Sequence, residues 1–176
     1  DGSKVRFTVA QGRASIGGGA GLELDLQGRY RDQAYVLHLV GDGLRELNDD
    51  TLPWHVRATG SIADASFGAE GSVRAVYDAE GVDLQVRLQG QRLAALGPVL
   101  EAELPDLGPY RLSGRLKEMQ RGVRVLGLQA TLGGSDFAGE AQYQGGPTPH
   151  LTATLTSRLL RTGDLEDVAL LQAVSR

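Results

Sequence analysis

The feature that most constrains this chain is a strict alternation of apolar and polar side chains over many short stretches. Successive side chains of a β-strand point to opposite faces of the sheet, so a period of two indicates a strand with one apolar and one polar face. The alternation is clear in Leu22–Gln27, Val82–Gln89, Tyr110–Leu116 and Leu151–Thr156. The chain is therefore predicted to be all-β, with one apolar face and one solvated face.

The spacing of these stretches predicts an antiparallel meander. The segments that join them are short and polar or rich in glycine, as in Asp32-Gln33, Ala79-Glu80-Gly81 and Gly145-Gly146-Pro147. Such joints are typical of tight hairpins and leave no room for crossover helices. We predict strands at 4–11, 20–31, 34–41, 53–62, 66–78, 81–90, 109–117, 121–132, 135–144 and 148–157.

A few segments depart from the alternation. The apolar phase slips near Leu126, which predicts a β-bulge there. Short helices are expected around 43–47 and around 92–100, the second one interrupted by Gly97-Pro98. A further helix is expected from Leu165, capped by Asp164, with a frayed tail as the alternative.

A faint internal repeat divides the chain. The stretch Leu52–Gly60 aligns with Gly108–Gly114, and Ser66–Gly71 resembles Ser135–Glu140. Such self-similarity is typical of repeated supersecondary units. We therefore interpret the chain as a single segment with approximate repeat units 1–51, 52–107 and 108–176.

Composition narrows the possible functions. The 25 glycines and the aromatic fraction of only 5% suit a thin sheet with many tight turns. The formal net charge of −4 gives no basic surface for nucleic acid, so we expect no nucleic-acid partner. The absence of Cys excludes disulfides and thiolate chemistry, and no apolar run approaches the roughly 20 residues that span a bilayer. Because it begins Asp1-Gly2-Ser3, we expect the chain to be part of a longer protein.

The histidines do not form a recognisable catalytic or metal site. His38, His55 and His150 fall in three separate predicted strands, without the close spacing that metal-binding pairs require. The alternation places all three on the polar face, where a histidine is usually a plain surface residue.

Other polar and aromatic residues favour structural roles. Gly17–Gly21 resembles a phosphate-binding loop only superficially, because a strand follows it, and we interpret it as a flexible hairpin. Asp49-Asp50 and the acids of Gly163–Asp167 are expected in turns and caps, and Trp54 at a strand start or at one end of the apolar face. We therefore expect no enzyme activity, no cofactor and no metal.

The apolar face itself must be covered. At about 25 cal/mol per Å², several hundred Å² of exposed apolar surface costs on the order of 10 kcal/mol, comparable to the stability of a whole domain. Such a face packs as the core of a β-sandwich, meets a protein partner, or holds an apolar ligand. The residues alone leave these alternatives open.

The last part of the chain carries a family resemblance. The segments Leu132–Gly139, Pro149–Ser157 and Leu159–Leu165 resemble the C-terminal region of AsmA-family proteins in motif and spacing. That pattern is a Gly-Ser-Asp strand, a strand that opens with Pro and alternates Leu with Thr or Ser, and a closing Asp-Leu. Phe137 and Ala138 stand where the family often has Leu and Ser, which keeps the apolar face intact.

The resemblance implies both a fold and a function. AsmA-like proteins are anchored in the Gram-negative inner membrane and extend through the periplasm as a curved, U-shaped antiparallel sheet, called a β-taco or repeating β-groove. By resemblance, this chain is a non-enzymatic periplasmic segment that conducts phospholipid between the inner and outer membranes, tethered to the membrane by other parts of the protein. The alternative is a structural or assembly β-sandwich that pairs with a protein partner through an edge strand.

In the groove interpretation, phospholipid acyl chains lie against the aliphatic side chains of the strands. The predicted lining consists of Leu22, Leu24, Leu26, Leu37, Leu39, Val56, Phe67, Val73, Val82, Leu84, Val86, Leu88, Leu112, Leu116, Leu128, Leu132, Phe137, Leu151 and Leu155.

Overall fold

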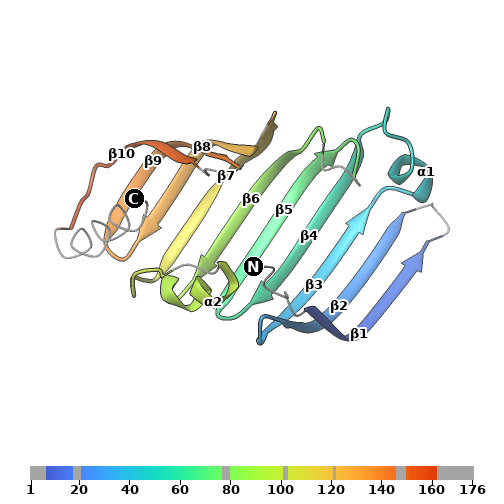
Figure 1. The fold of residues 1–176 in the computed structure, drawn as a ribbon, viewed down its shortest axis with the longest axis horizontal. Coiled ribbons are helices and arrows are strands. Elements are labelled where there is room, and N and C mark those ends of the chain that lie inside the picture. The colour runs from blue at the N-terminus through green and yellow to red at the C-terminus, as the bar shows by residue number, and fades with distance from the viewer. Residues whose placement is uncertain are drawn as a thin grey trace.

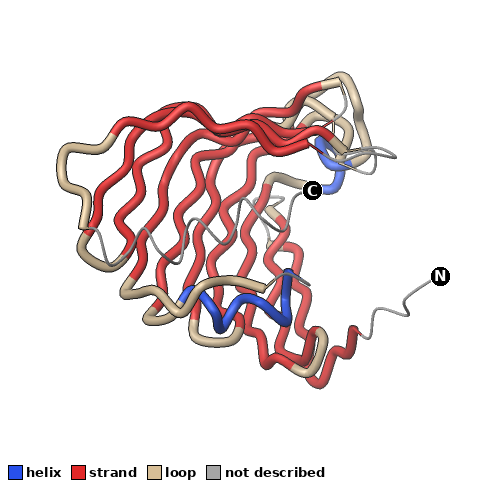
Figure 2. Tube along the Cα trace, turned by 60° about the vertical axis from the view of Figure 1, so that its left-hand side comes forward, coloured by secondary structure: helices blue, strands red, loops and turns tan. Residues whose placement is uncertain are grey.

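The computed structural model describes residues 7–17, 21–76, 80–100, 103–120, 122–145 and 150–161. These residues form one open antiparallel sheet whose ten strands follow each other in sequence order, with short helices at its margins (Figure 1). The strands are β1 (Phe7–Ile16), β2 (Leu22–Tyr30), β3 (Gln33–Gly41), β4 (Trp54–Ile62), β5 (Ala65–Val73), β6 (Asp83–Gly90), β7 (Tyr110–Met119), β8 (Gly122–Leu132), β9 (Ser135–Gln144) and β10 (His150–Thr156). The predicted all-β antiparallel meander is confirmed, and Figure 2 shows its curvature.

Two predicted strands end at the wrong residue. The first strand continues to Ile16 and does not end at residue 11, because a register shift between Val9 and Gln11 interrupts the period of two without ending the pairing. The strand predicted at 66–78 ends at Val73, where the chain bends and the Arg74 amide donates to the Glu80 carbonyl at 2.9 Å.

At one margin of the sheet, tight turns join β2 to β3, β4 to β5 and β8 to β9. The first is Arg31-Asp32, one residue earlier than predicted, with φ values of 49° and 65°. Ala63 and Gly133 take the same left-handed conformation, with φ of 54° and 59°. Turns of this hand match the twist of the flanking strands, so hairpins of only two loop residues can form. At the opposite margin, the Gly17 amide donates to Gly21 at 3.0 Å, which confirms the hairpin interpretation of that glycine run.

The predicted bulge in β8 is present. The pairing of β8 with β9 shifts between Val125 and Leu128, and Gly127 has a φ of 58°. The extra residue restores the apolar phase, so Val125 and Leu128 both face the apolar side although they are three positions apart.

The two internal helices also appear where they were expected. Helix α1 spans Leu44–Leu47; the 3₁₀ turn η1 (Leu93–Leu96) continues into α2 (Gly97–Leu100), so the winding changes at Gly97-Pro98. The expected C-terminal helix and its cap Asp164 lie outside the described residues. The three repeat units remain a prediction.

Candidate functional site: the apolar face of the sheet

The strand register aligns the apolar side chains in rows that cross the sheet. Residues directly opposite each other in an antiparallel pair share a face, so a chain of such pairs defines a row. The first row is Leu22, Gly41, Val56, Gly71, Leu84, Leu116, Val125, Ala141 and Ala153. The second row is Leu24, Leu39, Ala58, Ala69, Val86 and Gly114. The third row is Leu26, Leu37, Gly60, Phe67, Leu88, Leu112, Ala130 and Phe137. Neither a charged nor a polar side chain interrupts any of them.

The predicted lining residues outside these rows also belong to this face. Val73 pairs with Trp54, Leu132 pairs with Tyr110, and Val82 continues the alternation one residue before β6. Leu128 and Leu155 both lie opposite Gly139, and Leu151 lies opposite Tyr143. Leu151 and Leu155 are on the last strand and are the most open of the predicted set, with 75% and 45% of their surface exposed.

The middle of the apolar face is only half covered. We call the first and second rows the open centre. No residue with a side chain in these two rows is buried, and none of the described segments forms a second sheet over them. The buried apolar residues of the described chain lie at the margins: Tyr35, Trp54, Ala65, Ala75, Leu96, Leu107 and Tyr110.

One margin is covered by protein. The connector of residues 91–109 between β6 and β7 carries η1 and α2, and Leu96 from this connector packs with Ala65 and Tyr110. We call Ala65, Leu96 and Tyr110 the connector cluster. Three of the predicted lining residues, Leu88, Leu112 and Leu132, pack against it. We call this region the covered margin.

Aromatic rings on the apolar face lie over glycines of the neighbouring strands. A methyl group at Gly41 would lie 2.1 Å from Trp54 Cζ2, and one at Gly60 would lie 2.6 Å from Phe67 Cζ. Tyr35 covers Gly28, and Tyr110 covers Gly90, in the same way. The rings fill the space that the glycines leave, so the sheet presents a shallow surface with small residues beside large ones.

Trp54 and Tyr110 are buried at opposite margins of the sheet and differ in their hydrogen bonding. Trp54, at the start of β4 as predicted, is 5% exposed and donates from Nε1 to the Asp42 carbonyl at 2.9 Å. Tyr110 is 2% exposed, and its hydroxyl has no hydrogen-bond partner within the described residues. Burial raises the pKa of the Tyr110 phenol, which keeps it neutral.

The opposite face is held by cross-strand ion pairs. Arg57 bonds Glu70 at 2.6 Å, and Arg124 bonds Glu140 on the neighbouring strand. Asp83 accepts from Arg115 at 2.5 and 2.8 Å, and this hydrogen bonding lowers the pKa of Asp83. These ion pairs are open to solvent, so this face of the sheet is hydrated. Each pair contributes little to the stability of the fold.

The histidines lie on the solvated side, as predicted. His38 Nδ1 is 2.7 Å from Asp25 Oδ1, and His55 Nδ1 is 2.7 Å from Asp42 Oδ2. His150 is exposed at the start of β10. The aspartate partners were not predicted, because each comes from a segment 13 positions away and depends on the strand register.

Asp49 serves a turn in the loop after α1, and three polar residues on the solvated face form one further group. Asp49 accepts from the Thr51 amide at 3.0 Å and from its hydroxyl at 2.6 Å, which confirms its turn role and lowers its pKa. Glu23, Asp25 and His38 place ligand atoms within 4.8 Å of one another, but such groupings are common on polar surfaces without an ion. The acids of 163–167 lie outside the described residues.

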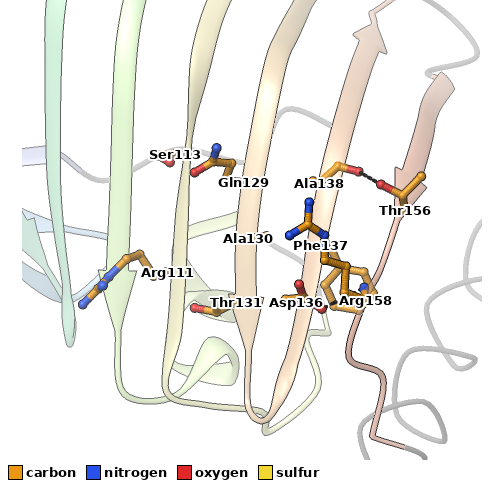
Figure 3. A pocket seen from close by; sticks show the side chains of 10 residues that line it. All are labelled: Arg111, Ser113, Gln129, Ala130, Thr131, Asp136, Phe137, Ala138, Thr156 and Arg158. Carbon is orange, nitrogen blue, oxygen red and sulfur yellow. Dashed lines mark hydrogen bonds between the residues drawn. The ribbon is translucent and has the colours of Figure 1, made fainter.

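Hollows on the polar face differ in chemistry from the apolar rows. One of them, of about 490 Å³, lies across β7 to β10 between Arg111 and Arg158 (Figure 3). In it, Asp136 Oδ1 accepts from the backbone amides of Arg158 and Leu159 at 3.0 and 2.6 Å, which lowers the pKa of Asp136. Charged side chains, Arg111, Asp136 and Arg158, lie around this hollow, whereas no charged residue lies in the apolar rows. The apolar face therefore remains the candidate site for hydrocarbon.

Comparison of the chain with models of protein families, with curated proteins and with solved structures finds no match in any of the three. Of the helices in the described chain, none has the length and apolar character needed to cross a membrane.

Proposed function

We propose that the open centre binds the hydrocarbon chains of phospholipid, and that the protein is a non-enzymatic segment of a lipid conduit. The observation that carries this proposal is the open centre: its two uninterrupted apolar rows cross the sheet without a covering layer among the described residues. The face offers aliphatic contact and almost no hydrogen-bonding groups. It therefore suits acyl chains and has no means of selecting a head group.

The physical basis is the cost of leaving such a face in water. Each methylene group that leaves water contributes roughly 0.8 kcal/mol, so an acyl chain lying along a row of leucines gains several kcal/mol. The rows run across successive strands, and a chain can therefore slide from one strand to the next without breaking directional contacts. No covalent step is needed for such movement.

The resemblance of Leu132–Leu165 to AsmA-family proteins supports the cellular setting of the proposal. In that setting the segment lies in the periplasm, is tethered to the inner membrane by other parts of the protein, and passes phospholipid between the two membranes. The competing sandwich hypothesis requires a second layer over the open centre, and the described residues provide none.

Photo-crosslinking in cells tests the proposal. A photoreactive amino acid at Leu84, in the open centre, should capture phospholipid, whereas the same group at the neighbouring Gln85, which faces the solvated side, should not. At Leu112, beside the connector, capture should be weaker than at Leu84 because protein contacts this position. Capture of protein alone at Leu84, or equal lipid capture at Leu84 and Gln85, would contradict the proposal.

A further inference from the structure

The outer edge of β10 has no partner among the described residues. All seven residues of β10 are exposed. The chain that follows turns back toward the start of β9, where the Asp136 amide donates to the Leu159 carbonyl and the Arg161 amide donates to Ser135 Oγ, both at 3.0 Å. Among the described residues, no strand pairs with the backbone amides and carbonyls along the outer side of β10, and an edge of this kind can accept another strand.

β10 also lacks the devices that usually protect an edge strand. Its sequence, His150 to Thr156, contains no Lys, Arg, Asp or Glu and no proline. The other edge strand, β1, carries Arg13 and an irregularity between Val9 and Gln11, both of which discourage pairing. The two edges of the sheet thus differ in their readiness to pair.

The sequence of β10 is self-complementary. The five residues Leu151-Thr152-Ala153-Thr154-Leu155 read the same in both directions. We propose that β10 pairs antiparallel with β10 of a second copy of this chain, about a two-fold axis at Ala153. In this register each Leu151 lies opposite Leu155 of the other copy, and each Thr152 lies opposite Thr154.

In this register, side chains of the same kind meet on each face of the joined sheet. A two-fold axis perpendicular to the sheet keeps each face continuous, so the Leu–Leu pairs meet on the apolar side and the Thr–Thr pairs on the polar side. The most exposed leucine of the apolar face, at 75%, gains an apolar neighbour. Two apolar faces then join into one surface twice as wide, whatever ligand that surface binds.

Paired charges test the register. The double variant T152K/T154K places two lysines opposite each other across the axis, whereas T152E/T154K places a glutamate opposite a lysine. Both variants carry the same lysine substitution at position 154, beside Glu140 in the same chain, and they differ only in the sign of the charge at position 152. Sedimentation equilibrium of the intact chain should show a dimer that T152K/T154K weakens by tenfold or more and that T152E/T154K retains. Circular dichroism checks that both variants are folded.

Single cysteines locate the axis, because the chain has no native Cys. Opposed residues in an antiparallel pair have Cα atoms about 4.5–5.5 Å apart, within disulfide reach. A153C should therefore oxidise to a covalent dimer. L151C alone should not, because its own counterpart lies roughly 14 Å away at about 3.4 Å per residue. L151C mixed with L155C should form the mixed disulfide.

Three results would overturn the inference. They are a chain that stays monomeric at high concentration, a dimer that T152K/T154K leaves intact, and a covalent dimer that forms from L151C as readily as from A153C. A lipid-free apolar face would leave these outcomes unchanged, so the inference and the proposed function fail separately.

Discussion

The covered margin and the open centre of the same sheet are built from similar aliphatic side chains but end in different states. At the covered margin the connector brings Leu96 onto Tyr110 and Ala65. Leu96 is 5% exposed, Tyr110 2% and Ala65 1%. In the open centre, residues such as Leu39 and Leu84 remain only half covered. The deepest burial therefore lies at the covered margin, and we expect most of the folding stability there, whereas the open centre keeps apolar surface that a ligand could cover.

Removal of the Tyr110 ring at the covered margin should destabilise the protein most. Tyr110→Ala should lower the free energy of unfolding by about 3–5 kcal/mol, as for other large buried aromatics. Tyr143, which is 47% exposed on the same face, is the matched control, and Tyr143→Ala should cost less than about 1 kcal/mol. Urea unfolding followed by circular dichroism measures both. Equal losses would mean that the margin is not the stable part of the sheet.

A buried charge should destabilise the covered margin more than the open centre. Leu112→Asp should lower the free energy of unfolding by about 2 kcal/mol more than Leu84→Asp, because only Leu112 packs against the connector cluster. Thermal melting of the two variants, compared with Gln85→Asp on the polar face, gives the measurement. If Leu84→Asp unfolds the protein as Leu112→Asp does, the open centre is in fact a closed core.

The glycines beneath the aromatic rings give a smaller effect. A methyl group at Gly60 would lie 2.2 Å from the Val36 carbonyl oxygen and 2.6 Å from the Phe67 ring. Gly60→Ala should therefore cost about 1–3 kcal/mol in unfolding free energy. Gly68→Ala is the control, since its nearest atom outside the adjacent residues would be 3.9 Å away. A similar loss in both variants would assign the cost to the strand backbone and not to the ring.

The smallest effect concerns the segment that follows β10. The Leu159 amide, first among several donors, lowers the pKa of Asp136 below its unfolded value of about 3.9. The stabilisation is therefore present above that value and is lost as the pH falls through the lower folded pKa. The protection factor of the Leu159 amide, which is corrected for the intrinsic pH dependence of exchange, should fall in acid, and Asp136→Asn should remove that dependence. An unchanged pH dependence in Asp136→Asn would rule out this carboxylate as its source.

The sequence predicted which side chains share a face of the sheet, but not which other segments cover that face. Strict alternation in stretches such as Leu22–Gln27 reports directly on which side chains share a face, so the ten strands and a bulge near Leu126 could be predicted. The predicted end of β1 was wrong because a bulge breaks the same period from which strands are recognised.

What alternation cannot report is which distant segment lies over a row. Leu84 and Leu112 have the same local pattern, yet only Leu112 packs against the cluster formed with Leu96. The contact of Trp54 with Gly41 likewise depends on the register between strands, which a single strand does not encode. These features require the tertiary arrangement.

The central claim is that hydrocarbon, in place of a second protein layer, covers the open centre. Native mass spectrometry of the protein isolated from cells tests it most directly. Phospholipid adducts are expected on the unmodified chain and on Gln85→Asp, and they should be lost in folded Leu84→Asp. A chain free of lipid, or adducts that survive Leu84→Asp unchanged, would show that hydrocarbon does not cover the open centre.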